Sequence, residues 1–116
     1  MDVYQGWADL KDGVSDMEFA RAFENYMTHL KSSGAIEGWR LMRRKLGLAP
    51  DGLGEFHFLI EVRDLAQLDQ VFGMAASRAG DTEMHHHGLN SLVTNARFAL
   101  YRDFPDAVRK EGEERF

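Results

Sequence analysis

The sequence predicts an α+β domain with its elements in the order strand, helix, strand, strand, helix, strand. Four runs have the apolar and aromatic content of strands, two longer segments between them carry apolar residues at helical spacing, and Gly, Pro, Asp and Ser mark the joints. The length of 116 residues suits a single domain. We expect this domain to span residues 1–104 and a charged C-terminal tail to occupy residues 105–116.

The first strand and the first helix are expected in the N-terminal third. The run Val3–Leu10 ends at Lys11-Asp12-Gly13, which is typical of a turn. Ser15 and Glu18 then match a capping box, in which the Ser15 hydroxyl accepts from the Glu18 N–H and the Glu18 carboxylate reaches back. A helix therefore begins here and ends near residues 32–34. Its apolar stripe consists of Phe19, Phe23, Tyr26, Met27 and Leu30.

The middle of the chain predicts a β-hairpin. Residues Ile36–Leu48 form the second strand region, and Ala49–Gly54 contains the Pro, Asp and Gly residues of a tight reversal. The third strand, Glu55–Arg63, alternates clearly, so one face of it is core. Phe56, Phe58, Ile60 and Val62 point to that face, and Glu55, His57, Leu59 and Glu61 point away from it.

The C-terminal half predicts the second helix and the last strand. Asp64 can cap a helix whose apolar stripe ends at Gly80. Residues 81–95 can form a short additional helix, and Ala96–Phe104 is the last strand, ended by Pro105. The stripe of the second helix consists of Leu65, Leu68, Phe72, Ala75, Ala76 and Ala79.

The order of the elements predicts a four-stranded antiparallel sheet with the strand order 4-1-3-2. Right-handed crossovers place the first two strands parallel with a gap between them, and the third strand fills this gap. Both helices then cover one face and leave the other face bare. Strands one, two and four carry bulky groups, including Trp7, Trp39 and Tyr101, which a solvated face would not favour. We therefore predict a homodimer in which a second copy covers the bare face.

With these elements in place, the chain resembles the dimeric α+β barrel superfamily, in which the sheets of two ferredoxin-like subunits close into a shared barrel. The resemblance spans Val3–Phe104 and rests on element order and length, and on segments such as Ile36–Arg40 and Phe98–Phe104, which look like small uncharacterised bacterial members. It implies the ferredoxin-like βαββαβ fold. Members include cofactor-free monooxygenases, haem-degrading enzymes, cyclases, isomerising enzymes and stress-responsive proteins, so the resemblance implies a fold rather than a reaction.

Composition narrows the function classes. A net charge of -5 argues against a protein that tracks nucleic-acid phosphates, which would need Lys and Arg on one face. No apolar run approaches the roughly 20 residues that span a bilayer, and the start lacks a secretory signal, so we expect a cytoplasmic protein without a membrane partner. The absence of cysteine excludes disulfides, thiolate metal ligands and a cysteine nucleophile.

His57 is the first candidate catalytic residue, because its parity puts it with Glu61 on the face away from the helices. That face would line the shared barrel. A histidine there can act as a general base near neutral pH, with the carboxylate of Glu61 orienting it. The alternative is a hydrogen-bonded structural histidine at the dimer contact.

The candidate ligand-binding residues are aromatic groups and two arginines. The rings can form a wall for a flat organic ligand, and an arginine can hold its carboxylate bidentately. The alternative is dimer packing with surface arginines. These residues are Trp7, Trp39, Arg43, Arg97 and Tyr101.

The run His85-His86-His87 invites a metal interpretation. Consecutive helical residues are about 100° apart, so the three cannot all reach one ion, whereas His85 and His87 would share a face on an extended segment. No familiar metal-ligand spacing is present, so we expect a solvated segment and no metal or other cofactor.

Three functions are compatible with these features of the sequence. The first is a homodimer that binds a small organic molecule in a pocket on the barrel side of the sheet. The second is a cofactor-independent monooxygenase or isomerase-like enzyme with His57 as general base. The third is a structural or stress-related interaction protein with a packed barrel. An open cavity beside His57 would favour the first two, and a packed lumen the third.

Overall fold

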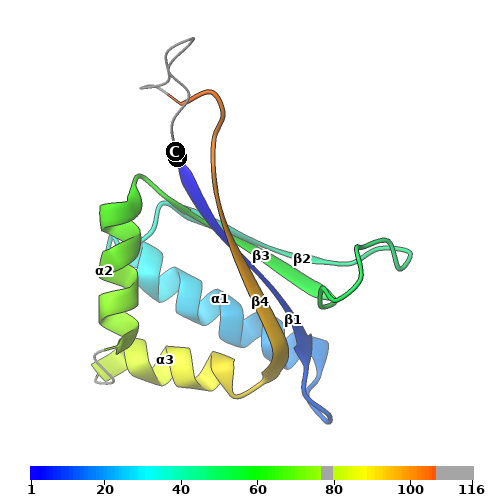
Figure 1. The fold of residues 1–116 in the computed structure, drawn as a ribbon. Helices are drawn as coiled ribbons and strands as arrows, with labels where there is room; N and C mark the ends of the chain where they lie inside the picture. The colour runs from blue at the N-terminus through cyan, green and yellow to red at the C-terminus, as the bar shows by residue number, and fades with distance from the viewer. Residues whose placement is uncertain (77–79, 107–116) are drawn as a thin grey trace.

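The computed structural model describes residues 1–76 and 80–106. These residues form a two-layer α+β structure, with a layer of helices on one β-sheet (Figure 1). Seven elements follow one another along the chain. They are β1 (Asp2–Leu10), α1 (Asp16–Ser32), β2 (Gly38–Arg43), β3 (Phe56–Val62), α2 (Leu65–Ala76), α3 (Gly80–Asn90) and β4 (Val93–Arg102).

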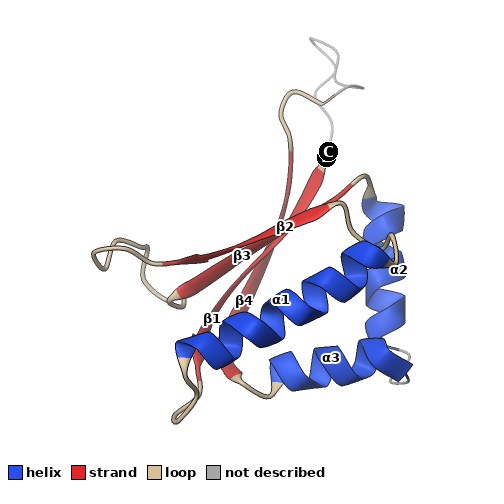
Figure 2. Ribbon diagram, turned by 180° about the vertical axis from the view of Figure 1, so that it is seen from behind, coloured by secondary structure: helices blue, strands red, loops and turns tan. Residues whose placement is uncertain are grey.

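The four strands form one antiparallel sheet in the order β2-β3-β1-β4, which is the predicted order read from the other edge. The two longest strands, β1 and β4, lie side by side, and β3 lies on the other side of β1. Tyr4 of β1 therefore stands opposite Ile60 of β3 on one side and Leu100 of β4 on the other. All three helices lie on one side of this sheet (Figure 2). The predicted ferredoxin-like fold is therefore confirmed.

The first helix forms as its sequence predicts. Ser15 caps it, accepting a hydrogen bond of 3.1 Å from the Glu18 N–H. The apolar stripe of α1 combines aromatic groups with the flexible side chains of Met27 and Leu30. Because the stripe packs against the sheet, its apolar surface is removed from water. All five residues of the predicted stripe are buried: Phe19, Phe23, Tyr26, Met27 and Leu30.

Some boundaries differ from the prediction. The second strand ends at Arg43 rather than Leu48, because Leu46 and Gly47 both have positive φ angles that an extended strand does not allow. The additional helix predicted near residue 82 is a full helix, α3, and β4 begins at Val93. The predicted charged tail lies outside the described residues from position 107 onward.

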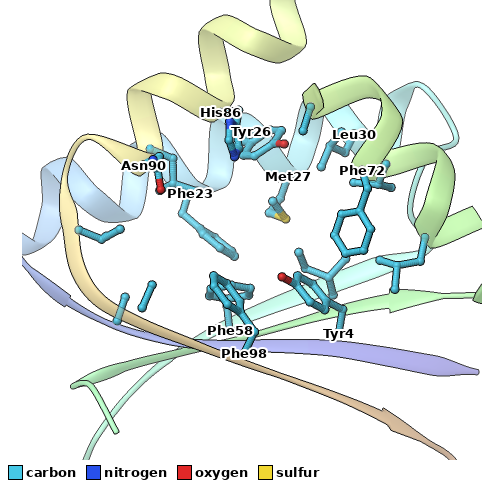
Figure 3. A pocket seen from close by; sticks show the side chains of 18 of the residues that line it. Tyr4, Phe23, Tyr26, Met27, Leu30, Phe58, Phe72, His86, Asn90 and Phe98 are labelled. Carbon is cyan, nitrogen blue, oxygen red and sulfur yellow. The ribbon is translucent and has the colours of Figure 1, made fainter. Parts of the chain in front are cut away.

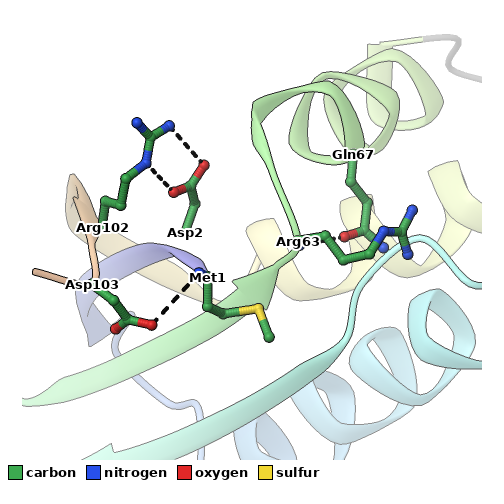
Figure 4. Close-up of polar contacts among 6 residues, drawn as sticks. All are labelled: Met1, Asp2, Arg63, Gln67, Arg102 and Asp103. Atoms are coloured by element: carbon green, nitrogen blue, oxygen red, sulfur yellow. Dashed lines mark hydrogen bonds and ion pairs between the residues drawn. The ribbon is translucent and has the colours of Figure 1, made fainter. Parts of the chain in front are cut away.

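Two buried polar side chains tie the elements together (Figure 4). Gln67 of α2 is 1% exposed, and its amide accepts from the Arg63 N–H at 2.7 Å and donates to the Gly34 carbonyl at 3.0 Å. Asp2 receives two hydrogen bonds from the Arg102 guanidinium, at 2.6 and 3.2 Å, across β1 and β4. These contacts satisfy groups that would otherwise destabilise the core.

No helix in the described part of the chain combines the length and the apolar character needed to cross a bilayer.

Candidate functional site

A cavity of about 170 Å³ lies between the sheet and the three helices (Figure 3). Its floor comes from β1, β3 and β4, its walls from α1 and α2, and part of its roof from α3. The lining is almost entirely apolar, so the cavity suits an apolar ligand better than water. The residues that line it are Tyr4, Ala8, Phe19, Phe23, Tyr26, Met27, Leu30, Phe58, Ile60, Leu68, Val71, Phe72, Ala75, His86, Leu89, Asn90, Val93, Ala96 and Phe98.

Three aromatic rings stand where the cavity meets solvent. Tyr4 stacks on Phe98 with ring centroids 5.6 Å apart, and meets Phe72 edge-on at 5.3 Å. Phe72 and Phe98 are 45% and 57% exposed, although both also line the cavity. The cavity therefore opens to solvent between α2, which carries Phe72, and β4, which carries Phe98.

The helices contribute three residues with polar side-chain groups to the cavity: Tyr26, His86 and Asn90. His86 and Asn90 are one helical turn apart on α3 and both line the cavity. The His86 ring meets the Tyr26 ring at 6.0 Å in a T-shaped contact. Figure 3 shows His86, Asn90 and Tyr26 together above the apolar walls. An apolar space with a few polar groups at one end can both enclose and orient a small molecule.

This cavity lies on the helix side of the sheet, and a pocket on the barrel side, which the sequence led us to expect, stays a prediction. The barrel side of a single chain is an open sheet face, whereas the described cavity lies on the opposite face, under the helices. The reason is that α2 and α3 do not pack closely onto β4, which leaves Phe98 and Leu100 about half exposed.

His57 lies on the open face, as its parity predicts, and is not among the residues that line the cavity. Its Nε2 atom is 3.0 Å from the Gln5 Oε1 atom, and its ring lies flat on that of Trp7. Burial lowers the pKa of His57 below its ordinary value of 6.5. Glu61 lies on the same face, but the hydrogen-bond partner of the imidazole is Gln5.

The five predicted ligand-binding residues do not converge on one place. Trp7, Arg97 and Tyr101 share the open face, and Arg97 stands directly opposite Trp7 across β1 and β4. Trp39 lies on the other face, where it meets Phe23 at 5.6 Å. Arg97 is exposed on β4 and donates to the Gly52 carbonyl at 3.4 Å.

Arg43 stands at the edge of the sheet, on the helix side. Its guanidinium donates to Glu55 at 2.5 Å and to Asp16 at 3.0 Å, and it lies over the Phe56 ring at 5.2 Å. This arrangement joins β2, β3 and α1 and leaves Arg43 already paired with two carboxylates.

The histidine run lies within α3, so His85 and His87 project about 200° apart and do not share a face. His85 stacks near Tyr26 and lies 5.0 Å from the His29 ring, while His87 is exposed. Among the side chains that the structure describes, no three of His, Cys, Asp or Glu are grouped as metal ligands.

The residues that shape the cavity mouth were not predicted as site residues from the sequence. Tyr4 was predicted only as part of a strand, and Phe72 only as part of a helical stripe. The parity of β1 could have placed Tyr4 on the helix side, opposite Ile60. The spacing of His86 and Asn90, four residues apart on a helix, could likewise have put them on one face.

Comparison with solved structures supports the fold. The chain superimposes on SnoaB, a cofactor-independent oxygenase from Streptomyces nogalater, with a TM-score of 0.67 and 12% identity, covering 93% of this chain and 97% of that one. A protein of Arabidopsis thaliana gives a TM-score of 0.70 at 10% identity, covering 93% and 100%. A dimeric protein of unknown function with a ferredoxin-like fold, from Bacteroides fragilis, gives 0.59 at 11% identity, covering 88% and 95%. At such identities the likeness is one of fold.

No curated protein sequence matches the chain. One family model does, and it covers residues 1–116. The chain therefore belongs to DUF6614, a family of unknown function.

Proposed function

We propose that this protein binds a small apolar organic molecule in the cavity between its sheet and its helices. The observation that carries the proposal is the apolar lining of the cavity together with its half-exposed mouth at Phe72 and Phe98. Large apolar side chains that stand exposed beside a cavity are typical of a binding site. Burying an apolar ligand there removes both the ligand and the exposed rings from water.

A hydrocarbon probe tests this proposal. We expect α-methylstyrene to bind the full chain, as measured by shifts of backbone amide signals in NMR titrations. Ala75→Leu should weaken binding at least about tenfold, because Ala75 lines the cavity and the larger side chain fills it. Ala66→Leu is the matched control, since Ala66 is exposed on the same helix and does not line the cavity.

Absence of binding to the wild-type chain, or equal binding by the two variants, would overturn the proposal. The control variant also separates a filled cavity from a general effect of leucine in α2.

We also propose that two copies associate through the open sheet face. This face carries Trp7, His57, Leu59 and Tyr101, among which Tyr101 is 62% exposed and the others are partly buried in one chain. Such a row of aromatic and aliphatic groups is better covered by protein than by water. A dimeric protein of the same fold, from Bacteroides fragilis, supports the proposal.

Sedimentation equilibrium tests the association. We expect the wild-type protein to have twice the mass of a single chain, which is 13.2 kDa. Leu59→Glu should yield a folded monomer, because it puts a charge in the middle of the open face. Met17→Glu, on the exposed side of α1, should stay dimeric. A monomeric wild-type chain would rule the association out.

An enzymatic function is a second candidate, favoured by the fold shared with the Streptomyces nogalater oxygenase. In this proposal His57 acts as general base from the open face, within the chamber that a second copy would enclose. Its lowered pKa supports the role, since the imidazole is neutral at pH 7 and able to accept a proton. Because Nε2 pairs with the Gln5 amide oxygen, Nδ1 would be the accepting atom.

Aerobic incubation with an electron-rich phenol tests this candidate, with product followed by chromatography. Turnover that is lost in His57→Ala but kept in Tyr4→Phe would support it. Tight binding without turnover would favour a carrier, and neither binding nor turnover would favour an interaction protein with a packed barrel.

A further inference from the structure

Among the described strand residues that line the cavity, Tyr4 alone has a polar side-chain group, its hydroxyl. Tyr4 lies on β1, in the middle of the sheet, and its helix-side neighbours across the strands are Ile60 and Leu100. Figure 3 shows its oxygen directed toward the centre of the cavity, while the ring is held between Phe72 and Phe98. Two aromatic contacts therefore fix the direction of the hydroxyl.

This hydroxyl has no hydrogen-bond partner within the described part of the protein. The Tyr4 ring packs against the hydrophobic core and makes aromatic contacts with Phe72 and Phe98. Burial raises the pKa of Tyr4 above its ordinary value of 10.0, so the group stays neutral at physiological pH and keeps its proton. A hydroxyl donor in apolar surroundings needs an acceptor, and a ligand can supply it.

The charge of the lining limits what that ligand can be. The cavity residues that the structure describes include no Asp, Glu, Lys or Arg. The nearest charged pair along β1 is Asp2 with Arg102, and these two already bind each other. An anionic ligand would therefore lose its hydration without gaining a Lys or Arg partner.

The size of the cavity limits the ligand further. In another protein, a dry apolar cavity of about 150 Å³ binds benzene. The cavity here has about 170 Å³, so it encloses one substituted ring. Aromatic side chains on the wall, on the floor and at the mouth offer faces and edges against which such a ring can pack; they include Phe23, Phe58 and Phe98 respectively.

We infer that Tyr4 selects the ligand, and that the ligand is an uncharged aromatic compound whose carbonyl oxygen accepts the hydrogen bond of the Tyr4 hydroxyl. This inference rests on the proposed binding function and adds to it the ligand class and the residue that distinguishes it. The roof groups His86 and Asn90 then face the end of the ligand away from Tyr4.

Three probes of nearly equal shape test the inference. Acetophenone carries a neutral carbonyl, α-methylstyrene replaces that oxygen with carbon, and benzoate carries a negative charge. By isothermal titration calorimetry or NMR titration, the wild-type chain should bind acetophenone about five- to tenfold more tightly than α-methylstyrene. Benzoate should bind more weakly than either at pH 7.

Tyr4→Phe is the decisive variant, because it keeps the ring and its stacking and removes only the hydroxyl. It should bind α-methylstyrene as the wild type does and should lose the preference for acetophenone. Tyr101→Phe is the matched control, since Tyr101 lies on the opposite face of the sheet, and it should keep the preference.

The outcomes separate the two levels of the proposal. If α-methylstyrene binds but Tyr4→Phe keeps the wild-type preference for acetophenone, the role of Tyr4 is overturned while the binding function stands. If benzoate binds best, the neutral ligand class is overturned. If none of the three probes binds the wild-type chain, the binding function and this inference fail together.

Discussion

The imidazole ring of His57 lies flat against the indole ring of Trp7, with the ring centroids 4.3 Å apart and the ring planes 7° apart. Together with the hydrogen bond to Gln5, this contact holds a neutral imidazole in a partly buried position. Protonation would place a charge where burial disfavours it, which is why the pKa is lowered. The stability of the protein should therefore depend on pH through His57, on the open face of the sheet.

His57 should make the protein less stable under mildly acidic conditions. Its pKa in the folded protein lies below the unfolded value of about 6.5, so protons bind more readily to the unfolded chain. The free energy of unfolding should fall as pH drops below 6.5, and this loss should end below the folded pKa. Urea unfolding at pH values on both sides of 6.5 measures it.

His57→Phe keeps a ring against Trp7 and cannot titrate, so its stability should decline less over the same pH range. His87→Phe is the control, because His87 is exposed on α3 and the wild-type decline should remain. An identical pH dependence in His57→Phe and the wild type would contradict the assignment.

The pair of Asp2 and Arg102 should stabilise the fold above the ordinary pKa of aspartate. The Asp2 side chain is 4% exposed, and the hydrogen bonds from Arg102 hold the pKa of Asp2 below 3.8. Stability from this pair is therefore full at neutral pH and lost as the pH falls through the folded pKa. Arg102→Met should lower the thermal midpoint at neutral pH and have less effect in strong acid.

Arg63→Met is the matched control for that substitution. Arg63 pairs with Glu37, whose side chain is 35% exposed, so this pair is more accessible to water than Asp2. We expect the smaller loss of stability from Arg63→Met. Equal losses in the two variants would show that burial of Asp2 does not strengthen its pair.

Gly6 is required by the ring that lies over it. A Cβ atom at this position would be 2.1 Å from the Cζ atom of Phe58, a residue that also lines the cavity. Gly6→Ala should push the Phe58 ring toward the cavity, destabilise the protein by about 1–3 kcal/mol, and weaken binding of the hydrocarbon probe. Chemical denaturation and NMR titration measure the two effects.

Gly73→Ala makes the same chemical change at a position where, apart from its chain neighbours and the nearby backbone of α2, no atom of the described residues lies within 4 Å of the added methyl. In the interior of α2 it should raise the free energy of unfolding by about 0.5–1 kcal/mol. A Gly6→Ala variant as stable as Gly73→Ala would mean that Phe58 moves without penalty.

Local chemistry in the sequence was sufficient for the order of elements and for much of the two faces. Ser15 and Glu18 predicted the start of α1, and the alternation from Phe56 to Val62 predicted the helix side of β3. These features depend on residues that are close together in the sequence, so they can be predicted directly from it. Segments with a less regular pattern were harder to assign to a face. In Ile36–Leu48, apolar and polar residues do not alternate clearly, so the face on which Trp39 lies could not be derived.

Sequence alone determined that helices cover one side of a 4-1-3-2 sheet and that His57 faces the other side. Only the tertiary structure decided where an empty space remains, because that depends on how closely α2 and α3 approach β4. The same distances bring Tyr4, Phe72 and Phe98 together from three elements and leave the Tyr4 hydroxyl directed into the cavity. The periodicity of the sequence assigns a side chain to a face of the sheet. It does not give the distance between that face and the helices that cover it.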